Sequence, residues 1–497
     1  MTLLSELDPD RICLRDMKRS LSGAKVSAQC DEFIGFLAEE KIRRLALFAE
    51  NGIDWVLVDL ACQAAGICLI PLPTFFSAQQ IRHVMQLCDI DAVVTDRPEL
   101  LAKISQAKIS FSQCAGLHKL QLGQLGTGAN SARLPAGTDK ITFTSGSTGQ
   151  PKGVCLSTEH LLQQAQRLCQ EVGVEHPRHL CLLPLSTLLE NVAGVYAPLL
   201  AQGEILVPGQ RQLGFEGSAL VDPQQLLTQL AILQPHTLIL IPQLLTLLVA
   251  AATRGWRVPA SLKFVAVGGA RVSMDSINAA RAAGIPVYEG YGLSECASVV
   301  SLNAPAHDKP GTCGKPLPGL DLTIENDEVI VHGSSMLGYV NDPESWGLES
   351  VATGDVGHFD AEGFLSISGR KKNVLISSYG RNISPEWVES ELLAHPLITE
   401  AVVIGDALPF CSALLFVRSD QTSNFDLQAW IERVNANLPD YAQVRKWIRL
   451  DQPLAMNREF MTENGRPRRD NINTAFQAEI ENLYIYSADS RMAAGSM

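Results

Sequence analysis

The sequence predicts an α/β fold, with a large N-terminal domain of stacked α/β sheets and a small β subdomain, followed by a smaller, mobile C-terminal α+β domain. Two observations support this prediction. Short apolar runs bounded by turn residues alternate with amphipathic segments over most of the chain, which is typical of buried parallel strands joined by helices. Near residue 311 the pattern changes to short alternating pieces, which indicate antiparallel hairpins. A chain of 497 residues is long enough for both domains.

The apolar runs of the first part predict buried strands, because each is short and ends at turn residues. They are residues 43–50, 67–73, 91–96, 179–185, 204–208, 236–242 and 263–270. Residues 77–88 between them form an amphipathic helical pattern. The most apolar stretch, 237–253, contains Pro242 and is shorter than the roughly 20 residues that a bilayer requires. We therefore interpret it as a strand that leads into a helix.

Residues 322–333 and 357–369 predict hairpins, with turns near 325–327 and at 362–363. They would form the β subdomain, at about 311–370. We place the domain boundary near Arg370 to Lys372, which gives an N-terminal domain of residues 1–370 and a C-terminal domain of 371–497. Residues 384–395 predict a helix with Ser384 as N-cap and Pro385 at the first helical position. The small, polar residues 487–497 predict a loose tail.

Composition excludes several classes of protein. Hydrophobic residues make up 46% and charged residues 19%, as in ordinary globular proteins rather than disordered, collagen-like or coiled-coil chains. Forty Lys and Arg against 53 Asp and Glu give a net charge of −13, which argues against binding nucleic acid or anionic lipid through bulk charge. Any polyanion must be held locally. The 12 scattered cysteines indicate neither a zinc site nor a disulfide framework. The acidic, weakly apolar start is not typical of a signal peptide, so we expect a cytoplasmic protein without transmembrane segments.

The sharpest local signal is ITFTSGSTGQPKGVCLS at 141–157. An apolar strand runs into a loop of glycines, hydroxyl side chains and Lys152, which can surround a phosphate with donors and one positive charge. It is not the nucleotide-binding loop of ordinary nucleotide hydrolases, because Pro151 precedes the lysine and Gly153 follows it. A flexible Gly/Ser turn would have a similar composition.

With further motifs, this loop resembles the adenylate-forming superfamily, which includes acyl-CoA synthetases, carrier-protein adenylation domains and luciferases. The further motifs are EGYGLSE at 289–295, TGD at 353–355 and GRKKNVLISSYGRNISPEWVE at 369–389, and residues 37–73 also resemble the family's N-terminal half. The resemblance implies an AMP-forming acid–thiol ligase that converts a carboxylate and ATP to acyl-AMP and then to a thioester. It implies ATP, Mg2+ and coenzyme A, or the phosphopantetheine of an acyl carrier protein, as cofactors.

The resemblance also implies the residues of the site. The catalytic set would be Arg466, Lys152, Glu295 and Thr148, with Glu295 and Thr148 on the metal. The nucleotide-binding and cofactor-binding set would be Thr144, Ser145, Gly146, Ser147, Thr148, Gly149, Lys152, Gly268, Gly269, Ala270, Glu289, Gly290, Tyr291, Gly292, Ser294, Asp355, Arg370, Lys372 and Gly380. Within it Tyr291 offers an aromatic face to a nucleobase and Asp355 accepts hydrogen bonds from ribose hydroxyls. Lys372 would be the pivot of the C-terminal domain, and Gly380 would border the thiol tunnel.

Two positions depart from the family pattern. Arg466 stands where the family has its catalytic lysine, and no lysine follows Lys446. Arginine keeps the charge but presents a planar fork rather than a compact ammonium. Thr187, in LPLSTLLENV at 183–192, stands where many relatives have histidine or an aromatic gate, whereas Glu190 is retained.

The acid itself is indicated only by composition. Residues 183–200 are apolar, and no aspartate suits the ammonium group of an amino acid, so we expect a medium or long hydrophobic acid. No insertion typical of fatty acyl-AMP ligases stands out, which favours coenzyme A over a carrier protein. Two alternatives stay open: a ligase that loads an acyl carrier protein, and a nucleotide- or acyl-AMP-binding protein that lost turnover through Arg466. A hydrophobic substrate is also compatible with peripheral contact with a membrane.

Overall fold

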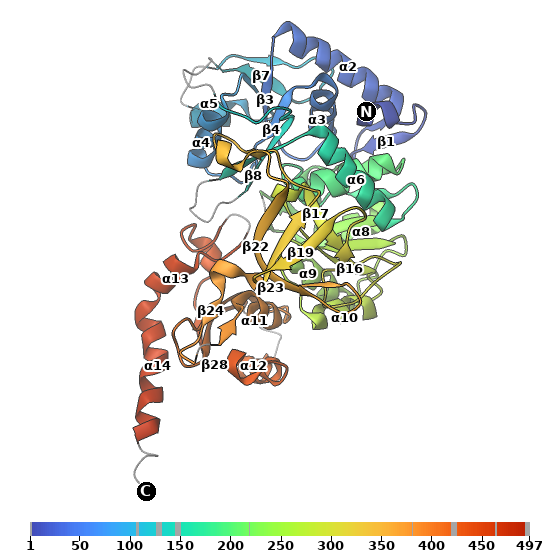
Figure 1. Ribbon diagram of the computed structural model, residues 1–497. Coiled ribbons are helices and arrows are strands. Elements are labelled where there is room, and N and C mark those ends of the chain that lie inside the picture. The colour runs from blue at the N-terminus through green and yellow to red at the C-terminus, as the bar shows by residue number, and fades with distance from the viewer. Residues whose placement is uncertain are drawn as a thin grey trace.

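The computed structural model describes residues 2–105, 109–125, 132–144, 151–217, 219–379, 381–418, 425–462 and 465–492. Figure 1 shows a large upper body made of two stacked sheets with their helices, and a smaller C-terminal part below it. Among the described residues, no helix combines the length and the apolar character that crossing a membrane requires. The α/β fold class predicted from the sequence is confirmed.

The first large sheet has eight strands among the described residues, with a parallel centre and antiparallel edges. Its order is β21 (Gly338–Tyr339), β9 (Lys152–Leu156), β8 (Lys140–Thr144), β4 (Cys68–Pro71), β3 (Arg44–Phe48), β5 (Ala92–Thr95), β7 (Gln121–Gln124) and β6 (Phe111–Gln113). Side chains alternate across the sheet, so that Leu45 and Leu47 join one buried cluster while Ala46 and Phe48 join another.

The second large sheet has nine strands in the described part of the chain, six of them in a parallel run. Its order is β18 (Lys315–Pro316), β17 (Ser298–Leu302), β16 (Val287–Leu293), β15 (Phe264–Val267), β14 (Thr237–Leu240), β10 (Arg178–Leu180), β11 (Glu204–Leu206), β1 (Ile12–Arg15) and β2 (Ser20–Ser22). The runs predicted as strands are confirmed, except that β10 covers only the start of 179–185. Residues 237–253 form β14 and then a helix, as predicted.

Helices cover both faces of the two sheets. One buried cluster joins the sheets through α2 (Gly23–Glu39), α3 (Ile53–Ala65), α6 (Thr158–Val172) and α7 (Ala197–Leu200), with α1 (Leu3–Glu6) beside it. The outer face of the first sheet packs on α4 (Ala78–Cys88) and α5 (Pro98–Ser105). The outer face of the second packs on α8 (Pro223–Leu233), α9 (Pro242–Thr253) and α10 (Met274–Ala282). A small hairpin, β12 (Phe215–Glu216) with β13 (Ala219–Leu220), lies apart from both sheets.

The β-rich pattern after residue 311 folds as an antiparallel sheet. Its order is β19 (Asp321–Glu325), β20 (Glu328–His332), β22 (Ser350–Phe359) and β23 (Leu365–Arg370). Asn326 and Asp327, both with positive φ, turn the first hairpin where the sequence predicted it. Gly363, with φ of 82°, lies in the second turn. A short helical turn at Lys371–Asn373 follows β23 directly.

The C-terminal part is built around a three-stranded sheet of described residues with a buried cluster on each face. Its elements are β24 (Leu375–Ile376), β25 (Asn382–Ile383), α11 (Pro385–Leu392), β26 (Ile398–Ile404), β27 (Cys411–Val417), α12 (Leu427–Ala436), β28 (Val444–Leu450), α13 (Arg469–Ala475) and α14 (Gln477–Met492). Helix α11 begins at Pro385 as predicted, although Ser384 bonds Glu386 rather than a backbone amide. The tail prediction was wrong for 487–492, because α14 continues through them and extends away from the body (Figure 1).

A seven-residue π-helix, η1 (Glu190–Tyr196), lies under the second sheet and carries a buried ionic network. The Nζ atom of Lys140 lies 2.6 Å from Asp59 Oδ1, 2.6 Å from Asn191 Oδ1 and 2.6 Å from the Tyr196 hydroxyl. Asn191 and Tyr196 are five residues apart, which in an α-helix would point them about 140° apart. The i→i+5 winding of a π-helix brings this spacing onto one face, and so both side chains reach the same ammonium.

Replacing Asp59 by Ala should destabilise the protein by about 3–5 kcal/mol, because it leaves the Lys140 ammonium buried without its counter-charge. The midpoint of urea unfolding measures this. Asp275→Ala is the control, because the Asp275–Arg433 pair is exposed and its loss should cost less than about 1 kcal/mol. An unchanged midpoint for Asp59→Ala would contradict the importance of this network.

Candidate active site

A cavity of about 1500 Å3 lies where the second large sheet, the four-stranded sheet and the C-terminal part meet. Many of the residues predicted for the site line it: Thr144, Lys152, Gly268, Gly269, Ala270, Glu289, Gly290, Tyr291, Gly292, Ser294, Glu295, Asp355, Arg370, Lys372 and Arg466. They come from segments far apart in the sequence, so the fold brings them together. Ser145, Gly146, Ser147, Thr148, Gly149 and Gly380 lie outside the described residues.

The strands beside the predicted phosphate loop form an antiparallel pair. Thr144 at the end of β8 pairs with Lys152 at the start of β9, so residues 145–151 connect two adjacent strands. The Lys152 side chain extends over the ring of Tyr339, with Nζ 5.2 Å from the ring centroid. Its ammonium therefore lies beside the cavity at the root of the loop.

Two glycines near β15 and β16 are required by the local backbone. Gly269 follows β15 with φ of 83°, a conformation that side chains with a Cβ rarely adopt. At Gly292, a Cβ would lie only 1.9 Å from the carbonyl oxygen of Ser298 on the adjacent strand. The lack of side chains lets the backbone itself form this wall of the cavity.

Asp355 is held between an aromatic hydroxyl and a guanidinium. The Tyr291 hydroxyl donates to Asp355 Oδ2 at 2.6 Å, and Arg370 Nε lies 2.7 Å from Asp355 Oδ1. Burial raises the pKa of Asp355, while Arg370 and the Tyr291 hydrogen bond oppose this change. Each carboxylate oxygen can accept a second hydrogen bond, and so the group can still receive ligand hydroxyls.

Arg466 reaches the cavity from the C-terminal part, and its Nη2 donates to the carbonyl oxygen of Gly269 at 3.2 Å. It stays accessible through the open cavity, yet protein atoms surround its guanidinium. This burial lowers its pKa, and the nearby Arg370 lowers it further. The pKa of Lys372 is lowered too, by burial and then by the same two arginines. Such a concentration of positive charge suits a polyanionic ligand.

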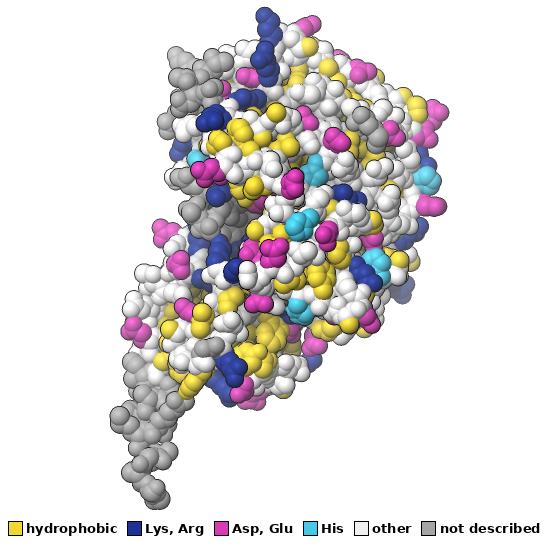
Figure 2. Space-filling model, in the orientation of Figure 1, with side chains coloured by type: hydrophobic (Ala, Val, Ile, Leu, Met, Phe, Trp, Pro, Cys, Tyr) yellow, Lys and Arg dark blue, Asp and Glu magenta, His cyan; other side chains and the backbone are white. Residues whose placement is uncertain are grey.

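Figure 2 shows one face of the molecule with its charged side chains coloured by type. Lys and Arg side chains gather where the large upper body meets the smaller lower part. The chain as a whole has a net charge of −13, so the cations at this junction are a local feature. A polyanion bound at this junction would be held by a local group of cations, as the acidic composition predicts for any polyanionic ligand.

Glu295 is oriented by Tyr339, a residue that the sequence analysis missed. The Tyr339 hydroxyl donates to Glu295 Oε1 at 2.9 Å, and the amide of Met336 donates to the backbone carbonyl of Glu295 at 2.7 Å. Because β21 pairs with β9, Tyr339 also packs against Lys152. No local signal could have revealed this residue, since it lies 44 positions from Glu295.

Glu289 and Arg271 both line the cavity, and the charge of Arg271 acts on the Glu289 carboxyl. Glu289 is buried, and its Oε2 has no hydrogen-bond partner among the described residues. Burial raises its pKa to about 7, although Arg271 opposes the change. Arg271, also missed by the sequence analysis, donates to Ile367 O at 2.9 Å and places its guanidinium 5.9 Å from the ring of Trp387. It therefore links the cavity to α11.

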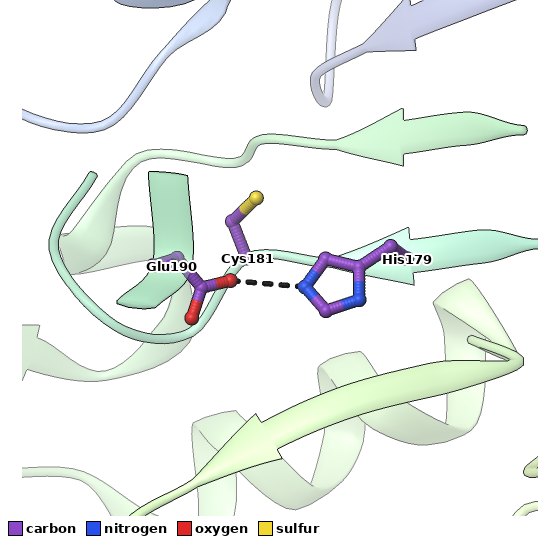
Figure 3. Close-up of side chains that lie close together, drawn as sticks. All are labelled: His179, Cys181 and Glu190. Carbon is purple, nitrogen blue, oxygen red and sulfur yellow. Dashed lines mark hydrogen bonds and ion pairs between the residues drawn. The ribbon is translucent and has the colours of Figure 1, made fainter. Parts of the chain in front are cut away.

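Thr187 and Glu190, which belong to the segment at 183–192, have different positions in the structure. Thr187 lines the large cavity, and its hydroxyl donates to Pro184 O at 2.6 Å. Glu190 is completely buried beneath it, where Oε1 lies 3.0 Å from His179 Nε2 (Figure 3). Glu190, His179 and Cys181 have donor atoms within 4.8 Å of one another, a group that the sequence did not indicate. The other nitrogen, His179 Nδ1, bonds the Thr237 hydroxyl at 2.9 Å, so the imidazole is already engaged on both sides.

Comparison with known proteins gives two family models that together span most of the chain. Residues 5–335 match the model described as AMP-binding enzyme, and 372–488 match the AMP-binding enzyme C-terminal domain. The long-chain-fatty-acid–CoA ligase FadD15 of Mycobacterium bovis is 27% identical, over 89% of this chain and 88% of that protein.

Solved structures show the same fold. The anthranilate CoA ligase AuaEII in complex with anthranoyl-AMP has a TM-score of 0.77 at 16% identity, over 96% of this chain and 97% of that one. The o-succinylbenzoate coenzyme A synthetase of Bacillus subtilis, in complex with ATP and magnesium ion, has a TM-score of 0.72 at 22% identity, over 94% and 98% of the two chains.

The raised pKa of Glu289 predicts how stability depends on pH. The folded state binds this proton more tightly than the unfolded state, whose carboxyl titrates near 4.5. The free energy of unfolding should therefore fall as pH rises from about 4.5 to 7, by up to about 3 kcal/mol from this group. Glu289→Gln should flatten this part of the profile and be more stable than the wild type at pH 8. If thermal unfolding gave the same pH dependence of stability for the wild type and Glu289→Gln, the raised pKa of Glu289 would be contradicted.

Proposed function

Because the chain belongs to the AMP-binding enzyme family, we propose that it activates a hydrophobic, fatty carboxylic acid with ATP and transfers the acyl group to coenzyme A. The protein is an AMP-forming enzyme of the acid–thiol ligase class. A carboxylate oxygen attacks the α-phosphate, pyrophosphate leaves, and acyl-AMP forms. The coenzyme A thiol then attacks the acyl carbon and AMP leaves. The convergence of Lys152, Tyr291, Asp355, Arg370 and Arg466 on one cavity carries the proposal.

In this proposal the described residues bind the nucleotide at three points. The ring of Tyr291 contacts the base, and Asp355 receives the ribose hydroxyls. Lys152, with Thr144 and the loop after it, holds the phosphates, with Arg370 near the sugar. Gly268, Gly269 and Ala270 let the adenylate lie against backbone. Catalysis then comes mainly from positioning and from neutralising the charge that develops at the α-phosphate.

The site also fits Mg2+. Glu295 supplies one carboxylate, and Tyr339 engages only Oε1, which leaves the other oxygen for a cation. Mg2+ prefers one or two carboxylates together with phosphate oxygens, and when bound it would neutralise phosphate charge. The magnesium in the Bacillus subtilis synthetase complex supports this assignment. Thr148, the second proposed ligand, lies outside the described residues.

The position of Arg466 favours turnover over a binding protein without activity. Its guanidinium lies beside Gly269, next to Asp355 and Arg370, where it can contact both the α-phosphate and the attacking carboxylate. The planar fork presents two parallel donors in a fixed geometry, whereas a lysine offers a compact point charge. We therefore assign Arg466 the role that the family gives to a lysine.

Coenzyme A is the proposed acceptor, because the relatives compared above are named as CoA ligases. Among these relatives both fatty and aromatic acids occur, and so the choice of a fatty acid rests on the apolar wall formed by residues 183–200. The boundary near Arg370 to Lys372 and the pivot at Lys372 stay predictions. The boundary is supported by the second family match, which begins at residue 372.

Carboxylate-dependent exchange of radiolabelled pyrophosphate into ATP tests the first half-reaction. The wild type should exchange with hydrophobic acids, and Arg466→Ala should exchange about 10²–10³-fold more slowly because it loses a fixed donor at the reacting phosphate. Arg433→Ala, which changes an exposed arginine of the C-terminal part, serves as control. If the wild type binds ATP without exchange while Arg466→Lys exchanges, the binding-protein alternative is correct instead.

Tyr339→Phe should raise the Mg2+ concentration needed for half-maximal activity about tenfold, because a hydrogen bond to a charged group contributes about 1.5 kcal/mol. At saturating Mg2+ its kcat should stay within about threefold of the wild type. Tyr288→Phe is the matched control, since Tyr288 stacks on Phe264 and does not line the large cavity. Equal Mg2+ dependence in Tyr339→Phe and the wild type would remove Tyr339 from the metal site.

A further inference from the structure

Three arginines lie close together in the segment 465–469, and their environments differ. Arg466 reaches the wall of the large cavity, as described above. Arg469 is held by the protein itself, because its Nη2 lies 2.7 Å from Glu389 Oε2. Arg468, between them, lines the large cavity, and no hydrogen bond or ion pair joins its guanidinium to another described residue. Arg468 therefore carries a charge that the described part of the chain does not pair.

Part of the Arg468 guanidinium is also withdrawn from water. Its Nε atom is buried, and this atom has no hydrogen-bond partner among the residues that the structure describes. A buried donor of a charged group costs free energy when it is left unpaired. The Nε of a guanidinium and a neighbouring Nη donate in parallel, which matches two oxygens of one phosphate group. The unpaired Nε therefore indicates an anionic ligand with this geometry.

The backbone around Arg468 is part of a short antiparallel ladder, which fixes the direction of its side chain. The Thr462 amide donates to Arg466 O at 2.7 Å, and the Arg468 amide donates to Phe460 O at 2.7 Å. Between these two hydrogen bonds, Pro467 forms an antiparallel bridge. Because side chains alternate along an extended chain, Arg466 and Arg468 project to the same side, about 6.6 Å apart along the backbone.

The surroundings of Arg466 show which part of the cavity this side faces. Arg466 lies in the electrostatic field of Asp355 and Glu295. These two carboxylates are the ones assigned above to the ribose and to the metal, so the side faces the nucleotide. Since Arg466 is assigned to the α-phosphate, we expect the next arginine on the same side to meet the phosphates beyond it.

Building on the proposed function, we propose that Arg468 binds the two outer phosphates of ATP, which leave as pyrophosphate. As the carboxylate oxygen bonds to the α-phosphorus, the bond from this phosphorus to its bridging oxygen breaks, and the electron pair stays on the pyrophosphate. Arg468 neutralises the charge that develops there, whereas Arg466 acts at the α-phosphate. The thioester step involves no pyrophosphate, and so Arg468 contributes to the first half-reaction alone.

Calorimetric titration with ATP and with AMP, in the presence of Mg2+ and without an acid, tests the proposal without turnover. Arg468→Ala should weaken ATP binding about tenfold or more and leave AMP binding within about twofold of the wild type, because AMP lacks the outer phosphates. Arg468→Lys keeps the charge but loses the fork, so its ATP affinity should lie between the two, which covers the case in which Arg468→Ala does not fold. Arg445→Ala changes an exposed arginine of β28 outside the cavity and is the matched control.

Two rates then separate the half-reactions. Pyrophosphate exchange should fall about 10²-fold in Arg468→Ala, while thioester formation from supplied acyl-AMP and coenzyme A should stay within about threefold of the wild type.

Equal losses of ATP and AMP affinity, or unchanged affinity for both, would overturn the proposal. A higher KM for coenzyme A with unchanged ATP binding would overturn it too and would assign Arg468 to the thiol substrate. If the wild type binds ATP but supports no exchange with any acid, the proposed function fails, while the titrations still decide the role of Arg468. A wild type that does not bind ATP would remove both.

Discussion

The buried ammonium of Lys140 joins three elements from distant parts of the chain by polar contacts, in addition to the apolar packing around them. Lys140 begins β8, the strand before the predicted phosphate loop, whereas Asp59 belongs to α3 and Asn191 and Tyr196 to the π-helix. Asp59 Oδ2 also accepts from Asn191 and Tyr196, so each polar atom of the network is engaged. A charge without water is tolerated only in such a complete network. The strand and the π-helix are therefore fixed together.

The same π-helix carries a second polar contact that restricts its sequence. Glu190 reaches His179, and a Cβ at Gly194 would lie 2.7 Å from both Glu190 Oε1 and His179 Nε2. A larger residue at this position would have to displace the Glu190–His179 contact. The unusual winding is thus maintained from two sides, by the ammonium on one and by the histidine on the other. In between, Leu189 lines the large cavity.

Local pattern was enough to predict most strands, the hairpin turns and the residues of the motifs, because alternation and turn chemistry act over a few positions. Local pattern did not predict contacts between residues that are far apart in the sequence. Tyr339 reaches Glu295 only because β21 joins β9, and Arg271 reaches Trp387 only because the C-terminal part packs there. The helix at 487–492 was missed because its residues are small and polar and have little intrinsic signal.

Arg271 lies between two regions of the molecule. Its charge acts on Glu289 in the cavity wall, and its guanidinium lies over the indole of Trp387. Anything that displaces its guanidinium, such as ionisation of Glu289 or a ligand that takes its place, also changes the polarity beside that indole. Because Trp387 lies on α11, this contact joins the C-terminal part to the wall of the large cavity, so that a cation over an aromatic ring helps to hold the two parts together.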